Sequence, residues 1–148
     1  MNAALASAAV VVRRTIAASA EDLFDAWLDP QALALWMRPG TIQSTVAHVE
    51  PRVGGSYEIL MQAASGPIQH KGVYRTIDRP RRLAFTWITA FTELQETLVT
   101  VDFISRGQGT EVVVTHEQLP ASAMPSHHKG WTSGLEHLDE ACQQGLIP

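Results

Sequence analysis

Histidines are the residues of this chain best suited to bind a metal or to move a proton, and there are six of them. His127 and His128 are adjacent, so on a helix their side chains would project about 100° apart, whereas two ligands on one helix usually lie three or four residues apart. The sequence contains neither an HExxH motif nor a paired Cys/His motif. We therefore expect no metal and no cofactor, and we interpret His127 and His128 as the solvated start of a helix.

His116 is the candidate for acid–base chemistry. It alternates with Val112 and Val114 along a β-rich run, so the three side chains should point inward, toward a helix. A buried imidazole needs a hydrogen-bond partner, because leaving it unpaired costs desolvation free energy. Two interpretations remain open: His116 exchanges a hydrogen bond or a proton with a ligand, or it is a core histidine satisfied by a tyrosine, a tryptophan or the backbone.

Nucleophilic catalysis has little support in this sequence. The single cysteine, Cys142, continues an apolar stripe and is expected to be packed, and no Gly-x-Ser-x-Gly motif is present. Carboxylates fall mainly on outward positions or at strand ends, without a pair for general acid and base work. These solvated carboxylates are Glu50, Glu58, Asp102, Glu111 and Glu117. We predict no catalytic residue.

The charge balance also excludes some partners. With 11 Lys+Arg against 15 Asp+Glu, the net charge of -4 gives no electrostatic footprint for nucleic acid or an anionic membrane. Four arginines nevertheless gather near one expected turn: Arg75, Arg79, Arg81 and Arg82. They could meet an acidic ligand or partner, but we expect a solvated cluster that protects a sheet edge.

Aromatic side chains are the remaining candidates for binding. All four tryptophans fall on stripes expected to be buried, together with Tyr57, Met61, Phe85 and Phe103; they are Trp27, Trp36, Trp87 and Trp131. A mixed aromatic and aliphatic lining with few polar groups is what a small-molecule pocket needs. A filled core has the same composition, so both interpretations stay open.

Apolar periodicity predicts the elements that position these side chains. The β-branched run Val10–Ile16 predicts a first strand. Ser19 can cap a helix whose apolar face ends with Leu28, and Asp29 followed by Pro30 predicts the start of a second helix. Two short helices are thus expected directly after the first strand.

From residue 41 to residue 119, β-branched and aromatic runs alternate with turn residues, which predicts an antiparallel meander. The expected strands are Thr41–Val49, Ser56–Met61, Ile68–Ile77, Arg82–Thr89, Thr97–Ser105 and Thr110–Gln118. The last segment, Ser126–Gln144, returns to helical periodicity, with Ser126 as the expected N-cap and Trp131, Leu135 and Leu138 on one face. At 1.5 Å per residue this helix would be about 28 Å long, enough to cross a sheet.

Length and composition fit one globular domain. The 148 residues, 45% of them hydrophobic, predict a single domain over 1–148 with an ordered core over about 10–144. The lone Cys142 allows no internal disulfide and favours a cytoplasmic location. Met1–Val12 lacks the basic segment of a signal peptide and is interpreted as a frayed N-terminus. No apolar stretch approaches the roughly 18 residues of a membrane span, so no membrane insertion is expected.

Several short segments carry a family resemblance through their order and spacing. They are Asp29-Pro30 with Leu33 and Trp36, the run VEPRVGGSY at 49–57, Gly72-Val73-Tyr74, PRRLAFTW at 80–87, GQGTEV at 107–112, THEQLP at 115–120, and Gly130-Trp131 with Leu135 and Leu138. Together they resemble the START-like helix-grip (SRPBCC) superfamily, in the branch named after the activator of heat-shock protein 90 ATPase. The resemblance covers about Val10 to Gln144.

The resemblance implies an α+β helix-grip fold. In that fold a strongly bent antiparallel sheet of about seven strands wraps on a long C-terminal helix, with an elongated apolar cavity between them. Relatives in the superfamily bind lipids, sterols, polyketides or plant hormones there, and some carry out cyclisation or hydrolysis. The eukaryotic co-chaperone behind the branch's name also has a separate N-terminal domain, for which we expect no counterpart before the strand at Val10.

We therefore expect this chain to bind a small, largely hydrophobic molecule between the sheet and the C-terminal helix. The expected contacts are Trp36, Tyr57, Met61, Trp87, Phe103, His116, Trp131 and Leu135. Two alternatives remain open: a cyclase-like or hydrolase-like enzyme acting in the same cavity, with His116 as its acid or base, and a co-chaperone-type module that binds heat-shock protein 90. A homodimer could form through an exposed N-terminal strand.

Overall fold

Seven antiparallel strands form one sheet in the spatial order β1-β7-β6-β5-β4-β3-β2. The structure is a computed structural model, which describes residues 9–147. The strands are β1 (Ala9–Ile16), β2 (Ser44–Val49), β3 (Ser56–Ala63), β4 (Gly66–Asp78), β5 (Arg82–Trp87), β6 (Thr97–Arg106) and β7 (Gly109–Glu117). The α-helices are α2 (Ala20–Ala26), α3 (Pro30–Trp36) and α4 (Met124–Gln143), and 3-10 turns lie at Ala90–Thr92 and Ala121–Ala123. The predicted α+β helix-grip fold is confirmed.

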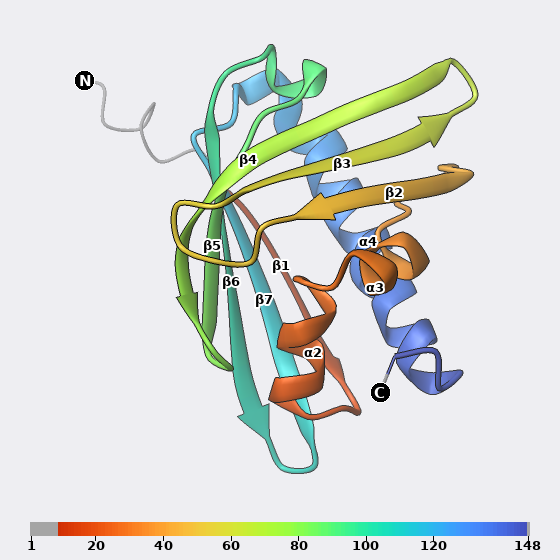
Figure 1. Ribbon diagram of the computed structural model, residues 1–148, viewed down its shortest axis with the longest axis vertical. Coiled ribbons are helices and arrows are strands. Elements are labelled where there is room, and N and C mark those ends of the chain that lie inside the picture. The colour runs from red at the N-terminus through yellow and green to blue at the C-terminus, as the bar shows by residue number, and fades with distance from the viewer. Residues whose placement is uncertain (1–8, 148) are drawn as a thin grey trace.

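The sheet bends strongly, and β4 belongs to both of its halves (Figure 1). Residues 66–73 of β4 pair with β3, whereas residues 74–78 pair with β5. Gly72 lies at this bend, where a Cβ atom would overlap the Thr86 carbonyl of β5. The two strands can therefore approach each other only because residue 72 has no side chain.

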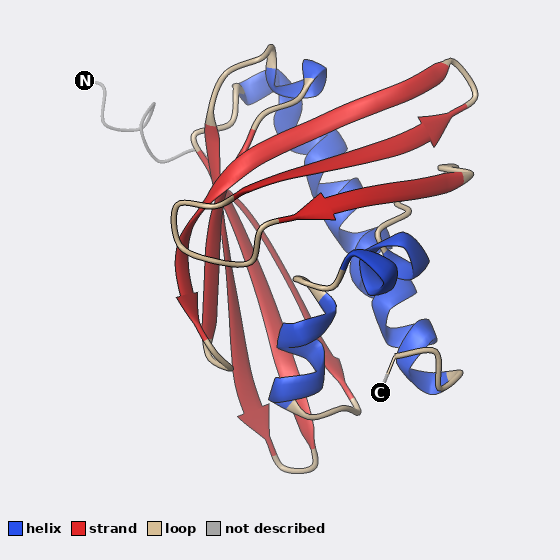
Figure 2. Ribbon diagram, viewed as in Figure 1, coloured by secondary structure: helices blue, strands red, loops and turns tan. Residues whose placement is uncertain are grey.

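The helices lie on the inner side of the bend (Figure 2), where α4 contacts β1 and α3, and α2 packs on β6. Strand alternation was predicted correctly: Val99, Val101 and Phe103 are buried, and Val112, Val114 and His116 are buried on β7. This alternation places the apolar face of the sheet against the helices.

The two short helices begin at the predicted caps. The Ser19 hydroxyl accepts a hydrogen bond from the Asp22 amide at 3.1 Å, and the Asp29 carboxylate accepts one from the Gln31 amide at 3.0 Å. Pro30 occupies the first turn of α3, where a missing N–H has no cost. The two caps therefore determine where α2 and α3 begin.

The predicted start of the last helix is wrong, because α4 begins at Met124 and Ser126 is not its N-cap. The Ser126 hydroxyl instead donates to the Ala123 carbonyl at 3.1 Å. Pro125 fits the first turn of α4, and the 3-10 turn Ala121–Ala123 leads directly into it. Pro125 therefore marks the start of α4 better than Ser126 does.

Several strand ends also differ from the prediction. β2 begins at Ser44 rather than Thr41, because the preceding residues turn at Gly40, whose φ of 62° lies in the left-handed region. β5 ends at Trp87, because Thr89 starts a 3-10 turn. β3 and β4 are longer than predicted and leave only Ala64 and Ser65 between them.

The arginine cluster does not protect a sheet edge. β4 and β5 are interior strands, and the edges are β1 and β2. Each arginine is exposed and pairs with a carboxylate: Arg79 with Asp25 at 2.8 Å, Arg82 with Asp102 at 2.7 Å, Arg81 with Asp78 at 3.1 Å, and Arg75 with Glu96 at 3.3 Å. The guanidinium of Arg79 lowers the pKa of Asp25. These pairs account for the cluster without an external acidic partner.

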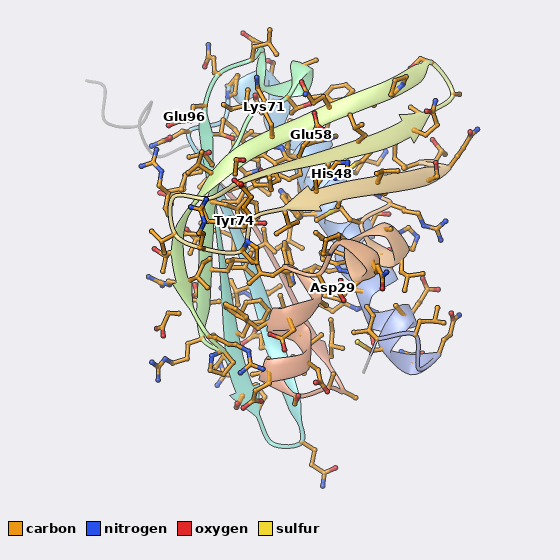
Figure 3. The ribbon with its side chains drawn as sticks, in the orientation of Figure 1. Asp29, His48, Glu58, Lys71, Tyr74 and Glu96 are labelled. Carbon is orange, nitrogen blue, oxygen red and sulfur yellow. The ribbon has the colours of Figure 1, made fainter. Side chains whose placement is uncertain are left out.

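The outer face of the sheet carries predicted carboxylates such as Glu58 and Glu111, alongside exposed apolar side chains such as Val46. His48, Glu58 and Lys71 are in register across β2, β3 and β4 (Figure 3). Glu111 lies on the outer side of β7, where Arg106 approaches it to 3.0 Å.

A polar contact attaches α4 to the edge strand β1 on the inner side of the sheet. Asp139 of α4 is buried and accepts a hydrogen bond from Arg14 of β1 at 2.8 Å.

The beginning of the chain needs one correction. Ala9–Val12 is part of β1 and pairs with β7, so the interpretation of a frayed end is wrong for these residues. The remainder of that segment, 1–8, lies outside the described residues. None of the described helices is both long enough and apolar enough to cross a membrane.

Candidate functional site

An apolar cleft of about 590 Å³ opens beside the first half of α4. Its walls come from the segment 37–42 after α3, the β3–β4 hairpin, Trp87 of β5, Phe91, and the stretch 126–133 of α4. The volume lies in the range of roughly 300–1,000 Å³ that is typical of small-molecule sites. The cleft therefore has room for a small ligand.

Three of the predicted contact residues line the cleft. They are Met61, Trp87 and Trp131. Trp131 is held by a hydrogen bond from its indole Nε1 to Nδ1 of His116, at 3.0 Å. Its ring also packs against Trp87, with ring centroids 5.2 Å apart. The two tryptophans together form the inner wall.

His116 connects this wall to the sheet through a chain of hydrogen bonds. Because Trp131 donates to Nδ1, the neutral ring carries its proton on Nε2, which donates to the Thr97 hydroxyl at 2.7 Å. The Thr97 hydroxyl in turn donates to the Trp87 carbonyl at 2.6 Å. Burial lowers the pKa of His116 to about 3, with a further contribution from His127. Tryptophan is thus the partner of His116, one of the alternatives that the sequence left open.

His127 is half-buried, whereas the sequence predicted a solvated side chain. Its ring meets that of His116 edge-on at a centroid distance of 5.1 Å, and it is hydrogen-bonded through Nδ1 to the Ala123 carbonyl at 2.8 Å. Burial lowers its pKa. His127 lines the cleft, whereas the next residue, His128, is exposed as expected.

His70 of β4 lies on the wall of the cleft beside Trp87. The two side chains are buried, with ring centroids 4.9 Å apart. Burial lowers the pKa of His70 to about 4, so the ring is neutral at pH 7. His70 Nδ1 and Trp87 Nε1 have no hydrogen-bond partner among the described residues.

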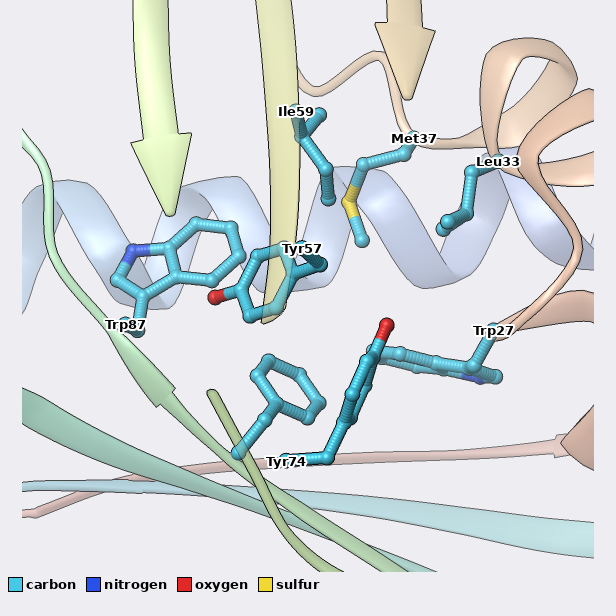
Figure 4. A pocket seen from close by; sticks show the side chains of 8 residues that line it. Trp27, Leu33, Met37, Tyr57, Ile59, Tyr74 and Trp87 are labelled. Carbon is cyan, nitrogen blue, oxygen red and sulfur yellow. The ribbon is translucent and has the colours of Figure 1, made fainter. Parts of the chain in front are cut away.

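The region behind the cleft is filled. Only about 10 Å³ of free space remains between Tyr57 and its neighbours, which are shown in Figure 4. Tyr57 donates its hydroxyl to the Thr86 carbonyl at 2.6 Å, and burial raises its pKa. The filled core and the open cleft thus occupy different places, and they share Met37 and Trp87.

The other predicted contacts lie away from the cleft wall. Trp36 is fully buried and donates to the Ala26 carbonyl at 2.9 Å, and Phe103 packs against Phe24 with centroids 5.2 Å apart. Leu135 is also fully buried. With Tyr57 and His116, these residues are buried and do not line the cleft.

Sequence reasoning missed most of the outer wall. Ile68 and His70 could have been found, because they alternate with the exposed Gln69 and lie opposite Met61 and Ile59 in the register. The segment 37–42 and Phe91 belong to connections and carry no periodic signal.

The lining of the cleft is mainly apolar. Among residues 9–147, the formally charged residue that lines the cleft is Lys129, on the exposed side of α4. Within residues 9–147, no three His, Cys, Asp or Glu side chains are grouped so that they could hold a metal ion. Cys142 packs against the core, and burial raises the pKa of its thiol to about 11.

Comparison with known proteins places the chain among relatives of the same shape. A family model described as Activator of Hsp90 ATPase homolog 1-like protein matches residues 17–143. A search of curated proteins finds no match. A solved structure from Chromobacterium violaceum is 26% identical, with a TM-score of 0.79 over 89% of this chain and 94% of that one.

Two further solved structures have similar coverage. An HSP90 activator from Plasmodium falciparum is 25% identical, with a TM-score of 0.72 over 95% of this chain and 97% of that one. A protein from Arthrobacter aurescens is 19% identical, with a TM-score of 0.83 over 95% of this chain and 88% of that one. At that identity the likeness concerns the fold alone.

Proposed function

The chain belongs to the family of activator of Hsp90 ATPase homolog 1-like proteins, and from this premise we propose that it binds a small, largely hydrophobic molecule in the cleft beside α4. The observation that carries the proposal is the cleft of about 590 Å³ with its mainly apolar lining. Met61, Trp87 and Trp131 would contact the ligand. Trp36, Tyr57, Phe103, His116 and Leu135 would hold them in place.

Apolar burial would supply most of the affinity. At about 25 cal/mol per Å², a ligand that buries about 200 Å² of apolar surface gains about 5 kcal/mol. The cost of association offsets part of this gain, so polar contacts must add to it for tight binding. His116 would reduce the cost, because Trp131 is already oriented by its hydrogen bond to this residue.

A neutral fluorescent dye, N-phenyl-1-naphthylamine, tests the proposal. We expect saturable binding of one dye molecule per chain, with enhanced emission as the dye leaves water. Trp131→Ala should weaken binding at least tenfold, because it removes the inner wall. Leu94→Ala is the matched control, since Leu94 is 72% exposed and does not line the cleft.

A second pair of variants separates occupancy of the cleft from general stability. A Cβ atom on Gly130 would meet only Pro39, at 4.0 Å, so Gly130→Leu should fold and extend into the cleft. Gly134→Ala makes a similar helix change at a buried glycine outside the lining. The proposal requires that Gly130→Leu loses the dye while Gly134→Ala retains it, and non-saturable or unchanged binding to Gly130→Leu would contradict it.

A second candidate function is binding to heat-shock protein 90. It is favoured by the similarity to the HSP90 activator from Plasmodium falciparum. The ATPase rate of purified heat-shock protein 90, measured with and without this protein, tests it. An unchanged rate at saturating protein would remove this candidate.

A further inference from the structure

Two residues that line the cleft each carry a buried polar atom without a hydrogen-bond partner among the described residues. Trp87 is 4% exposed and His70 is 6% exposed, and both residues line the cleft. Neither Trp87 Nε1 nor His70 Nδ1 has a hydrogen-bond partner within the part of the chain that the structure describes. A buried donor or acceptor without a partner destabilises a protein, so a ligand group that supplies the missing bond is favoured.

The orientation of Trp87 directs its N–H away from the filled core. Figure 4 shows the benzene half of the indole toward Tyr57 and the nitrogen on the opposite side of the ring. Tyr57 and Trp87 have ring centroids 6.5 Å apart, and the Trp87 backbone is fixed by the bond from Thr97 to its carbonyl. The nitrogen therefore points away from Tyr57.

The indole N–H groups of the other three tryptophans either have a hydrogen-bond partner or belong to a residue that does not line the cleft. Trp36 donates to Ala26 and Trp131 donates to His116. Trp27 Nε1 has no partner among residues 9–147, but Trp27 lies in the filled core and does not line the cleft. Trp87 thus offers the indole donor that is both available and placed at the cleft.

We propose that the cleft selects neutral apolar molecules that carry a hydroxyl group, which binds between Trp87 and His70. This inference rests on the proposed ligand-binding function and specifies its ligand class. The hydroxyl oxygen accepts the Trp87 N–H, and the same group donates to an unprotonated His70 Nδ1 or accepts from a protonated one. The ring centroids of Trp87 and His70 are 4.9 Å apart, so the two side chains are direct neighbours.

Other polar groups fit this wall less well. A carbonyl oxygen only accepts, so it would leave His70 unpaired whenever Nδ1 carries no proton. A carboxylate would lose its hydration against a neutral imidazole, which supplies no compensating charge. Lys129, the charged lining residue, is exposed on α4 rather than buried beside Trp87.

Three probes of similar shape test the inference: 2-naphthol, 2-methylnaphthalene and 2-naphthoate. Their dissociation constants are measured at pH 7.5 by displacement of N-phenyl-1-naphthylamine. We expect 2-naphthol to bind about tenfold more tightly than 2-methylnaphthalene, which corresponds to about 1.4 kcal/mol. 2-Naphthoate should bind more weakly than both.

Variants assign this preference to the two side chains. Trp87→Phe and His70→Phe should each reduce the ratio of the two dissociation constants toward one, because each removes a partner of the hydroxyl. Trp27→Phe is the matched control and should keep the tenfold ratio, since it removes an unpartnered indole away from the cleft. A change in cleft shape that weakens 2-naphthol and 2-methylnaphthalene equally leaves the ratio of their dissociation constants unchanged.

The indole N–H signals give a readout independent of affinity. The protein has four tryptophans, and the signal absent in Trp87→Phe identifies Trp87. 2-Naphthol should shift that signal downfield, and 2-methylnaphthalene should not. Equal affinities, a preference that survives both variants, or a preference for 2-naphthoate would overturn the inference while leaving hydrophobic binding intact. Failure of all three probes and of the dye to bind would overturn both proposals.

Discussion

Two neutral histidines inside the fold should make its stability depend on pH. His116 has a folded pKa of about 3 and His70 of about 4, both lowered chiefly by burial from an ordinary value of 6.5. Below pH 6.5 the unfolded chain therefore binds protons that the folded chain does not. The stabilisation from these groups is complete above pH 6.5 and is lost as the pH falls from 6.5 toward 3.

The size of the effect follows from the two pKa differences. Between pH 7.5 and pH 4.5 each histidine loses about 2.5 kcal/mol of its contribution, so together they reduce the free energy of unfolding by about 5 kcal/mol. This loss is a large fraction of the stability of an ordinary domain, roughly 5–15 kcal/mol. Release of Trp131 should occur only as the pH approaches 3, where the folded ring itself takes up a proton and His116 Nδ1 can no longer accept the indole N–H.

Urea unfolding at pH 7.5 and pH 4.5 measures this dependence. His116→Gln removes one titrating ring, so the loss between the two pH values should be smaller than in the wild type by about 2.5 kcal/mol. His48→Gln, on the exposed side of β2, is the control and should show the wild-type loss. Carboxylates titrate in all three proteins, so their contribution cancels. If His116→Gln lost as much stability as the wild type, the reasoning on buried neutral histidines would be refuted.

Three further substitutions test how the fold is held together, each measured by thermal and urea unfolding. Gly72→Ala should cost about 2 kcal/mol, because the added Cβ overlaps the Thr86 carbonyl, and a neutral effect would argue against the close approach of β4 and β5. Ser19→Ala should cost about 1 kcal/mol through loss of the bond to the Asp22 amide, and no change would show that this cap is dispensable. Gly130→Ala should stabilise α4 by about 1 kcal/mol, since its Cβ has space beside Pro39; a loss of stability would contradict that geometry.

Local patterns in the sequence predicted most of the fold. The period-two alternation placed Val101 and Val114 inside, and the caps at Ser19 and Asp29 began both short helices. The same alternation pointed His116 toward α4, where it meets Trp131. These features depend on neighbours in the chain, so the sequence carries them directly.

Features that depend on distant segments could not be predicted in the same way. The arginine cluster was predicted to protect a sheet edge, but the order of strands places β4 and β5 inside the sheet. The cleft takes its wall partly from the segment 37–42 and Phe91, which have no periodicity to indicate a buried or exposed side. His127 packs against His116 of β7, a tertiary contact that helical periodicity does not indicate.

Nuclear Overhauser effects between bound N-phenyl-1-naphthylamine and protein methyl groups test the central claim most directly. The claim is that the space beside α4 holds an apolar ligand. With methyl-labelled protein, we expect contacts from the dye to Met37, Met61 and Ile68, which line the cleft. Contacts confined to exposed methyls such as those of Val46 and Leu94, with none to the cleft residues, would contradict it.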